Sequence, residues 1–323
     1  MAKIRTGFDS DSLLSTRGRK SFRFRFRLLG SIVISLLISG LILGVVTARL
    51  LRDIISEDFN QQQLILARHT ARMVDQNIQF LKKELISLSF SPSLTEFCQS
   101  KENRMKTALE NRMNIALETV KNSSVISIAL LDSFGNLLKV VGEERYLPLK
   151  TTPRKEPAFF QWCLLPGNQH RVFLSQFEPN KDPKDNHLYM IMATPVGTYQ
   201  KEASRENPAI RPLGVIAFLI DSTKFLERFT KDIHSGKTGY AWVIDNNGNF
   251  VIHIEKDFIG GNAFLVRQAR DPSINFIAVN TLQKEAMLKG EEGIGWYYSG
   301  WHRGEIGKMK KLVAFTPIHL SDE

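Results

Sequence analysis

The sequence predicts an α+β fold with an N-terminal transmembrane helix and a long helical stalk, followed by two copies of one antiparallel-sheet module. Three observations lead to this prediction. Residues 28–48 contain no charged side chain, and the residues that follow place an apolar side chain at every third or fourth position. The turn motif Asp-x-x-Gly-Asn occurs twice, at Asp132 and at Asp245. The chain has 323 residues, of which 43% are hydrophobic, so it is long enough for about two folded domains.

The positive charge of the chain is concentrated at its N-terminus. Residues 1–27 form a basic arm with eight Lys or Arg residues against two Asp, a net +6 that leaves only +4 of the total +10 for the rest of the chain. A folded surface that binds nucleic acid would carry a basic patch of its own. We therefore expect no nucleic-acid partner. The alternation of Phe and Arg over residues 22–27 fits a membrane interface.

Residues 28–48 are predicted to cross the membrane as one helix. About twenty apolar residues in a helix span the hydrocarbon core of a bilayer. The basic arm places the N-terminus in the cytoplasm and the rest of the chain outside, by the positive-inside rule. Membrane lipid is therefore an expected partner. A cleaved signal peptide is the alternative, but the apolar region of such a peptide is only about 7–15 residues long.

Residues 49–91 are predicted to form a stalk helix. No Gly or Pro occurs between Val45 and Ser91, so the helix is expected to leave the membrane and end near Phe90, before Pro92. Its apolar residues alternate steps of three and four, which is a heptad seam: Leu64, Ala67, Ala71, Val74, Ile78, Leu81, Leu85 and Leu88. The seam either forms a homodimer or docks on the later part of the same chain. A second amphipathic helix is expected over residues 104–120.

Each Asp-x-x-Gly-Asn motif is predicted to close a β-hairpin. Asp132 can accept hydrogen bonds from the turn backbone, and Gly135 allows a positive φ; Asp245 and Gly248 repeat these roles. Further strands are expected near residues 171–177, 188–196 and 213–221 after the first hairpin, and near 295–299 and 311–318 after the second. Helical segments are expected in FFQWCLL, residues 159–165, and over 262–288. Two copies of one α+β module is the economical interpretation.

From residue 214 onward the sequence resembles a known family. The run GVIAFLIDSTKFLERFTKDIHSGKTGYAWVIDNNGNFVIHIEKDFIGGNAF, residues 214–264, resembles the junction of a double Cache sensor domain. There the last strand of the membrane-distal module leads through a short helix into the membrane-proximal module. KGEEGIGWYYS and KKLVAFTPIHL, which begin at Lys289 and Lys310, resemble the later strands of the second module. The likeness covers about residues 50–320.

The resemblance implies two PAS-like modules along the N-terminal helix, with sheets of the order 2-1-5-4-3, sensing small molecules outside the bacterial inner membrane. We assign the membrane-distal module to residues 92–222 and the membrane-proximal module to residues 223–323. The second copy has no counterpart of the strand over 213–221, so it is expected to be incomplete. Such modules serve histidine kinases, chemoreceptors and diguanylate cyclases. The likeness is closest to sensor histidine kinases, and a non-sensing membrane scaffold is the alternative.

The ligand site is expected in the distal module, where sensors of this family hold ligands against the face of the sheet. Arg154 can pair with a carboxylate through two parallel hydrogen bonds, and Phe160 and Trp162 offer aromatic walls. Tyr189 and Thr194 complete the pocket if they face it. The expected ligand is a small anionic metabolite or an amino acid. The alternative is that the two aromatic residues are simple core and Arg154 is a solvated loop charge.

The family's amino-acid sensors place an Arg close to a Trp that an aromatic residue follows. In this chain Cys163 follows Trp162, and Pro157 separates Arg154 from the aromatic residues. This departure is why an anionic metabolite is considered beside an amino acid.

The sequence contains no pattern that predicts catalysis, a metal or a cofactor. SGKTGY, residues 235–240, includes the GKT of a phosphate-binding loop, but Lys231 stands where that loop requires its first Gly, and the segment precedes a strand. The seven His residues have no metal-ligand spacing. Cys98 and Cys163 match no redox motif, and they form either one disulfide or two buried thiols.

Overall fold

The computed structural model describes residues 12–100, 102–143, 157–180, 185–197, 200–201, 210–303 and 306–320. For residues 12–27, 200–201, 210 and 306 it describes the backbone only. The chain divides into two compact units, residues 1–59 and residues 60–323. Helix α1, Ser12–Ser89, begins in the first unit and ends in the second.

In the first unit, α1 presents apolar side chains on all sides. The large hydrophobic residues between Leu28 and Ile55 are all exposed, which is unfavourable in water and favourable in lipid. By length and composition, α1 is the one helix among the described residues that could cross a membrane. The predicted membrane helix therefore lies within a single helix that continues to Ser89, one residue short of the predicted end.

In the second unit, the predicted heptad seam packs against the same chain. Val74, Ile78, Leu81, Leu85 and Leu88 are buried in one core cluster together with residues of the six-stranded sheet, called the distal sheet below. The sequence left two alternatives for the seam, a homodimer contact or docking on the later part of the same chain. Residues 74–88 dock on the same chain. Outside the seam, the stalk carries exposed apolar residues: Ile65, Leu66, Met73 and Phe80.

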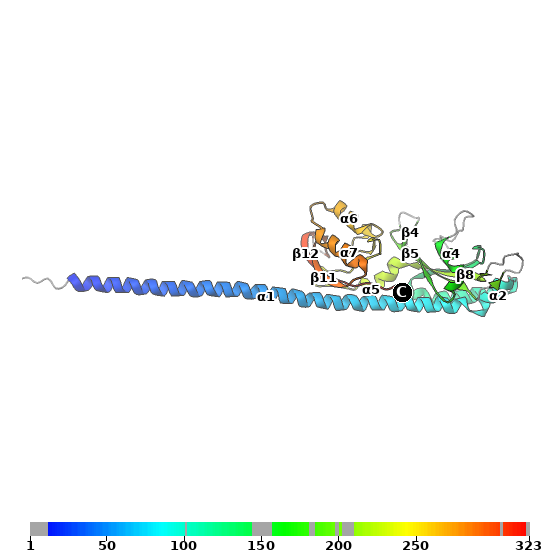
Figure 1. Cartoon of the computed structure of the whole chain (residues 1–323), viewed down its shortest axis with the longest axis horizontal. Coiled ribbons are helices and arrows are strands. Elements are labelled where there is room, and N and C mark those ends of the chain that lie inside the picture. The colour runs from blue at the N-terminus through cyan, green and yellow to red at the C-terminus, as the bar shows by residue number, and fades with distance from the viewer. Residues whose placement is uncertain are drawn as a thin grey trace, which may run out of the picture. The chain divides into compact units, whose positions relative to one another are not determined.

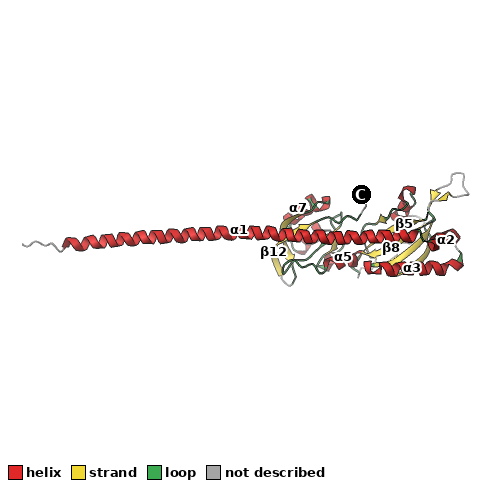
Figure 2. Ribbon diagram, turned by 90° about the horizontal axis from the view of Figure 1, so that it is seen from below, coloured by secondary structure: helices red, strands yellow, loops and turns green. Residues whose placement is uncertain are grey.

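After Ser89 the chain turns back through two helices. Pro92 does not simply end α1, because it is also the first residue of α2, Pro92–Ser100, a position where proline is well tolerated. Helix α3, Lys106–Val120, follows after a 3-10 turn, Asn103–Met105, and buries Leu109 and Met113. The predicted second amphipathic helix, residues 104–120, is thus confirmed. In Figure 2, α1 and α3 lie side by side across the sheet.

The distal sheet is antiparallel, with its strands in the order β2-β1-β8-β5-β3. Counted in chain order as five strands, this is the order 2-1-5-4-3 that the family resemblance implies for a module. A sixth short strand, β4, pairs with β5. The strands are β1 (Val125–Asp132), β2 (Leu137–Gly142), β3 (Phe173–Leu174), β4 (Glu178–Pro179), β5 (Leu188–Val196) and β8 (Gly214–Asp221). Strands β6 (Gln200–Lys201) and β7 (Ile210–Arg211) pair with each other.

The two faces of the distal sheet bury different parts of the chain. Successive strand residues point to opposite faces, so the even-numbered residues of β5 and β8 face the stalk. Met192 and Phe218, for example, join the core cluster that contains α1 and α3. The odd-numbered residues, such as Ile191 and Ala217, pack with helix α4, Ala158–Cys163. Figure 1 shows the sheet between α4 and the cyan part of α1.

The second half of the folded unit, called the proximal half below, begins after helix α5, Ser222–Thr230, whose first turn is capped by Asp221. Its elements are β9 (Val243–Ile244), β10 (Phe250–Ile252), α6 (Ala263–Arg270), α7 (Ile277–Glu285), β11 (Gly293–Trp301) and β12 (Ile306–Phe315). In the described residues, β9 with β10 and β11 with β12 form separate two-stranded sheets. The expected helical region and later strands are confirmed, whereas the incompleteness of the second copy stays a prediction.

Both Asp-x-x-Gly-Asn turns have the same geometry. Oδ1 of Asp132 accepts backbone hydrogen bonds from Phe134 and Asn136, both at 2.9 Å, and Gly135 has φ 83°. Oδ1 of Asp245 accepts backbone hydrogen bonds from Asn247 (2.9 Å) and Asn249 (2.8 Å), and φ of Gly248 is 79°. In each turn the Asn amide also donates to Oδ2 of the Asp at 3.0 Å. The predicted roles of Asp and Gly are confirmed, and the Asn amide adds a third bond.

The proximal half also contacts the stalk directly. Nε of Arg68 donates to Oε2 of Glu292 at 2.9 Å, and the backbone N–H of His319 donates to Oδ1 of Asp75 at 3.0 Å. Val251 and Ile252 of β10 join the core cluster that contains the stalk seam. Residues 60–89 of α1 therefore pack against both halves of the folded unit.

Candidate functional site

Helix α4 positions two of the predicted ligand-binding residues on one face of the distal sheet. Pro157 precedes its first turn with φ −58° and ψ 144°, an extended conformation that suits a residue just before a helix. Phe160 is fully buried in the cluster that α4 forms with the sheet. Trp162 lies at the edge of this cluster, half-buried, with its ring 5.7 Å from the ring of Phe173. The helix thus supplies aromatic surface, part of which is accessible.

Tyr189 lies on the same face, one strand into the sheet. It is buried in the cluster of Phe160, and its hydroxyl donates to Oδ2 of Asp185 at 2.7 Å. Asn180 Nδ2 donates to the same oxygen at 2.8 Å, and the backbone N–H of His187 donates to Oδ1 at 3.0 Å. Partial burial alone would raise the pKa of Asp185, but these hydrogen bonds outweigh it and lower the pKa. Asp185 is therefore a fixed carboxylate beside the aromatic cluster.

The structure does not bring all five predicted residues together. Phe160, Trp162 and Tyr189 share the α4 face of the sheet. Thr194 belongs to the even-numbered residues of β5, which face the stalk, and its hydroxyl donates to the carbonyl of Arg171 at 2.8 Å. Arg154 lies outside the described residues.

Sequence reasoning missed the acidic residues at one end of β5 and β8. Asp221 is 1% exposed and pairs in register with Tyr189. Its Oδ2 lies 2.8 Å from His187 Nδ1 and 3.3 Å from Lys224 Nζ, and its Oδ1 accepts the backbone N–H of Lys224 at 2.9 Å. The sequence did carry a signal, because an Asp between a strand and a helix that starts with Ser is a typical helix cap.

The geometry of the α4 face suits binding rather than catalysis. An aromatic wall, a tyrosine hydroxyl and a fixed carboxylate can hold an apolar group and a hydrogen-bond donor of a small molecule. Among the described residues, no group of three His, Cys, Asp or Glu side chains is arranged to bind a metal ion. Cys98 and Cys163 are buried thiols in the clusters on opposite faces of the sheet, and burial raises the pKa of Cys163.

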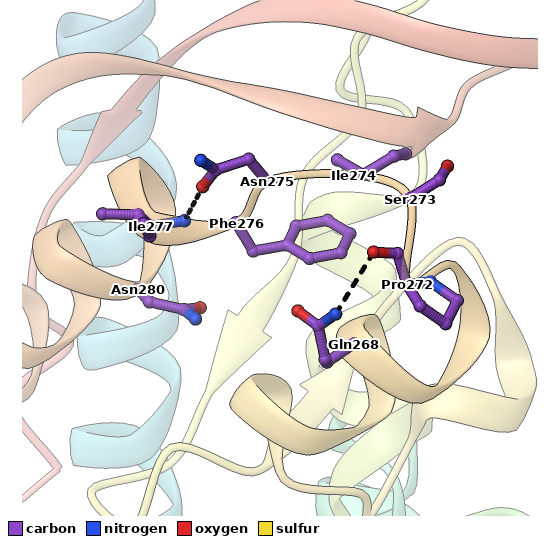
Figure 3. Close-up of a pocket in the computed structure, with 8 residues that line it drawn as sticks. All are labelled: Gln268, Pro272, Ser273, Ile274, Asn275, Phe276, Ile277 and Asn280. Atoms are coloured by element: carbon purple, nitrogen blue, oxygen red, sulfur yellow. Dashed lines mark hydrogen bonds between the residues drawn. The ribbon is translucent and has the colours of Figure 1, made fainter.

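A surface cavity of about 320 Å³ lies elsewhere, in the proximal half. Figure 3 shows it between the end of α6 and the start of α7, where the ring of Phe276 points toward its centre. Asn275 Oδ1 accepts the backbone N–H of Ile277 at 2.8 Å, and Gln268 Nε2 lies 3.5 Å from the carbonyl of Pro272. None of the four predicted ligand-binding residues that the structure describes lines this cavity.

The order of the distal sheet, the stalk along one of its faces and the aromatic cluster on the other agree with the family resemblance seen in the sequence. The model of the Cache domain, in its double form dCache_1, matches residues 51–322. The chain belongs to the Cache domain family. Cache domains are extracytoplasmic, ligand-binding sensor domains without catalytic activity of their own, so the matched region is a sensing module.

Solved Cache structures share this fold at low sequence identity. A domain of a sensory box/GGDEF family protein from Vibrio parahaemolyticus is 12% identical with a TM-score of 0.51, covering 82% of this chain and 98% of that one. The ligand-binding domain of the Campylobacter jejuni chemoreceptor Tlp3, solved with 4-methylisoleucine, is 12% identical with a TM-score of 0.52, covering 82% and 88%. The extracellular domain assigned to the histidine kinase vpHK1S-Z8 is 12% identical with a TM-score of 0.50, covering 82% and 94%.

These likenesses establish a shared fold and leave the type of signalling protein open. No curated protein matches the sequence.

Proposed function

We propose that this Cache chain is the extracytoplasmic input region of a bacterial sensor histidine kinase, anchored in the inner membrane with its N-terminus in the cytoplasm. It binds a small anionic metabolite or an amino acid on the α4 face of the distal sheet. Phe160, Trp162 and Tyr189 form the apolar wall of this site, and Arg154 supplies the cation. Thr194 acts from the other face of the sheet by tying β5 to the carbonyl of Arg171.

One observation carries the proposal: a single sheet separates the aromatic cluster from the stalk. Tyr189 and Ile191 pack with α4, while their neighbours Met190 and Met192 pack with the cluster that contains Leu81 of α1. A ligand that shifts β5 or β8 must therefore also act on the packing of α1. Protein cores are densely packed, so such a displacement is passed on and not absorbed.

The homodimer that the sequence suggested requires a different surface from the predicted seam, which the chain itself covers over residues 74–88. Leu66, Met73 and Phe80 recur at steps of seven on the uncovered side of the stalk, and each is about 40% exposed. A repeat of seven keeps one seam facing a partner helix. We place the contact between two copies along this stripe, where a ligand-induced shift of α1 reaches the partner.

A chemoreceptor or diguanylate cyclase input region is the second candidate. Its support is that two of the similar folds belong to a chemoreceptor and to a GGDEF family protein. Binding at the α4 face is common to all these classes.

The test is a thermal-shift screen of the full chain in lipid nanodiscs against organic acids and amino acids. A ligand that binds only the native state raises the melting temperature in proportion to the logarithm of its concentration. One chemical class is expected to give such a shift in the wild type and to lose it in Arg154→Ala and Trp162→Leu. Arg171→Ala is the matched control, because it removes an exposed arginine of the same module. No shift from any compound, or a shift unchanged in both variants, would favour a non-sensing scaffold or another site.

A further inference from the structure

Arg267 is a buried cation in the proximal half. It lies on α6, is only 3% exposed, and makes one hydrogen bond among the described residues, to Oε1 of Gln283 on α7. Its guanidinium lies 5.0 Å from the ring centre of Phe250 and 5.4 Å from that of Trp242. Burying a charge is costly unless it is paired and hydrogen-bonded. Aromatic faces compensate only part of that cost.

The acidic residues near α6 pair with another arginine. Arg270, one turn further along the helix and exposed, lies 3.3 Å from Asp257 and 3.8 Å from Glu255. Arg267 has no ion pair within the part of the chain that the structure describes. The fold therefore directs its carboxylates to the exposed arginine and leaves the buried one without a counter-ion.

The polar groups nearest Arg267 are Gln283, Tyr297 and Tyr240. Gln283 is fully buried, its oxygen accepts from Arg267, and its Nε2 has no partner among the described atoms. Tyr297 is 7% exposed, and Tyr240 is half-buried with its hydroxyl 3.3 Å from His253 Nε2. Lys311, also buried, lies 5.1 Å from the ring centre of Tyr240 and donates to the carbonyl of Thr238 at 2.6 Å. The buried guanidinium of Arg267 without a counter-ion and the unpaired Nε2 of Gln283 beside it describe a site for an anion.

We propose that the proximal half holds a second ligand site, in which Arg267 and Gln283 bind the carboxylate of a short monocarboxylic acid. Both oxygens of a carboxylate match the guanidinium fork, Gln283 Nε2 supplies a further donor, and the rings of Trp242 and Phe250 enclose a short apolar tail. Tyr240 and Trp242 are half-buried, so they form the side from which a ligand enters. The site is separate from the α4 face, and it stands whether or not the distal module binds a ligand.

The test measures the binding of acetate to the full chain in nanodiscs at constant ionic strength. Calorimetry gives the affinity and the number of sites, and the melting temperature reports stabilisation of the folded chain. One acetate per chain is expected to bind saturably and to raise the melting temperature, whereas acetamide, which has the same shape without charge, has no effect. Gln283→Glu puts a carboxylate of the same shape against the guanidinium. It is expected to raise the melting temperature without acetate and to weaken acetate binding about tenfold or more.

Two further variants guard against a folding defect and a misplaced site. Tyr240→Phe, at a half-buried position, is expected to weaken acetate binding several-fold while the chain stays folded. Arg270→Gln removes an exposed arginine from the same helix and is expected to leave binding unchanged. No saturable binding in the wild type, unchanged affinity in both Gln283→Glu and Tyr240→Phe, or loss in Arg270→Gln would overturn the site. Loss in Arg154→Ala alone would move the anion to the distal module, so this inference would fail while the proposed function remained.

Discussion

At the scale of single residues, His253 shows how burial sets a charge state. Its ring lies 4.6 Å from that of Phe250 and 4.8 Å from that of Phe258, and its Nδ1 accepts the backbone N–H of Glu255 at 3.0 Å. The proton of the neutral ring therefore sits on Nε2, facing the hydroxyl of Tyr240. Burial, with a smaller contribution from the charge of Arg267, lowers the pKa of His253 to about 3.

This low pKa predicts a loss of stability in acid. Between about pH 6.5 and pH 3 the imidazole is protonated in the unfolded chain and neutral in the folded one, so unfolding takes up a proton. The stabilisation is fully present above pH 6.5. As the pH is lowered from 6.5 to about 3, the free energy of unfolding decreases by up to about 1.4 kcal/mol per pH unit. Denaturant unfolding of His253→Phe is expected to show a shallower pH slope by that amount. His69→Gln, at an exposed position, should keep the wild-type slope; equal slopes in all three chains would disprove the assignment.

The paired turns give a second prediction at this scale. Asp245→Ala removes the acceptor of three hydrogen bonds and is expected to lower the free energy of unfolding by about 1–3 kcal/mol. Asn246→Ala, at the exposed neighbour, is expected to change it by less than about 0.5 kcal/mol. Equilibrium denaturation gives the free energy of unfolding of both variants for comparison. A similar cost for both would mean that the side chain of Asp245 does not hold the turn.

What the sequence reveals about single residues depends on how local their roles are. The roles of Asp132 and Gly135 follow from turn chemistry within four residues, and both were predictable. Asp185 and Asp221 acquire their partners only when β5 and β8 lie side by side, so spacing along the chain did not single them out. Arg267 and Gln283 meet across two helices for the same reason.

At the scale of elements, the stalk has a buried side and an exposed side. Leu81→Ala removes a fully buried side chain from the core that joins stalk and sheet, and it is expected to lower the free energy of unfolding by about 2–5 kcal/mol. Phe80→Ala, at the adjacent and 39% exposed position, is expected to cost less than about 1 kcal/mol in the isolated chain. Denaturant unfolding below the concentration of dimerisation compares the two. If Phe80→Ala proved the more costly, the buried side would be misassigned.

The elements were predictable in proportion to the strength of their periodic pattern. The stalk helix, α3, β5 and β8 agree with the sequence to within about two residues, because long amphipathic or continuously apolar segments are distinctive. The short helix α2 was missed, since Pro92 was interpreted only as a helix end. The sequence did not predict which apolar strand residues face the stalk and which face α4, because this depends on the order of the strands in the sheet.

At the scale of the whole molecule, the exposed stripe of the stalk predicts a homodimer. The full chain in nanodiscs or mild detergent is expected to contain two copies by light scattering, and the double variant Leu66→Glu with Phe80→Glu is expected to be a single copy. Charges at positions that face each other in a helical pair oppose association. Arg72→Gln, on an exposed neighbouring position, should remain a dimer. A double variant that keeps two copies would place the contact elsewhere.

We propose that ligand binding at the α4 face is passed through the distal sheet to the stalk, because the two pack on opposite faces of that sheet. The most direct measurement is hydrogen exchange of the full chain in nanodiscs, with and without the compound that gives the largest thermal shift. Slower exchange is expected in α4 and β5, and also in residues 74–88 of α1, which pack on the opposite face of the same sheet. Protection confined to α6 and α7, or protection of α4 and β5 with no change in residues 74–88, would contradict this coupling between the ligand site and the stalk.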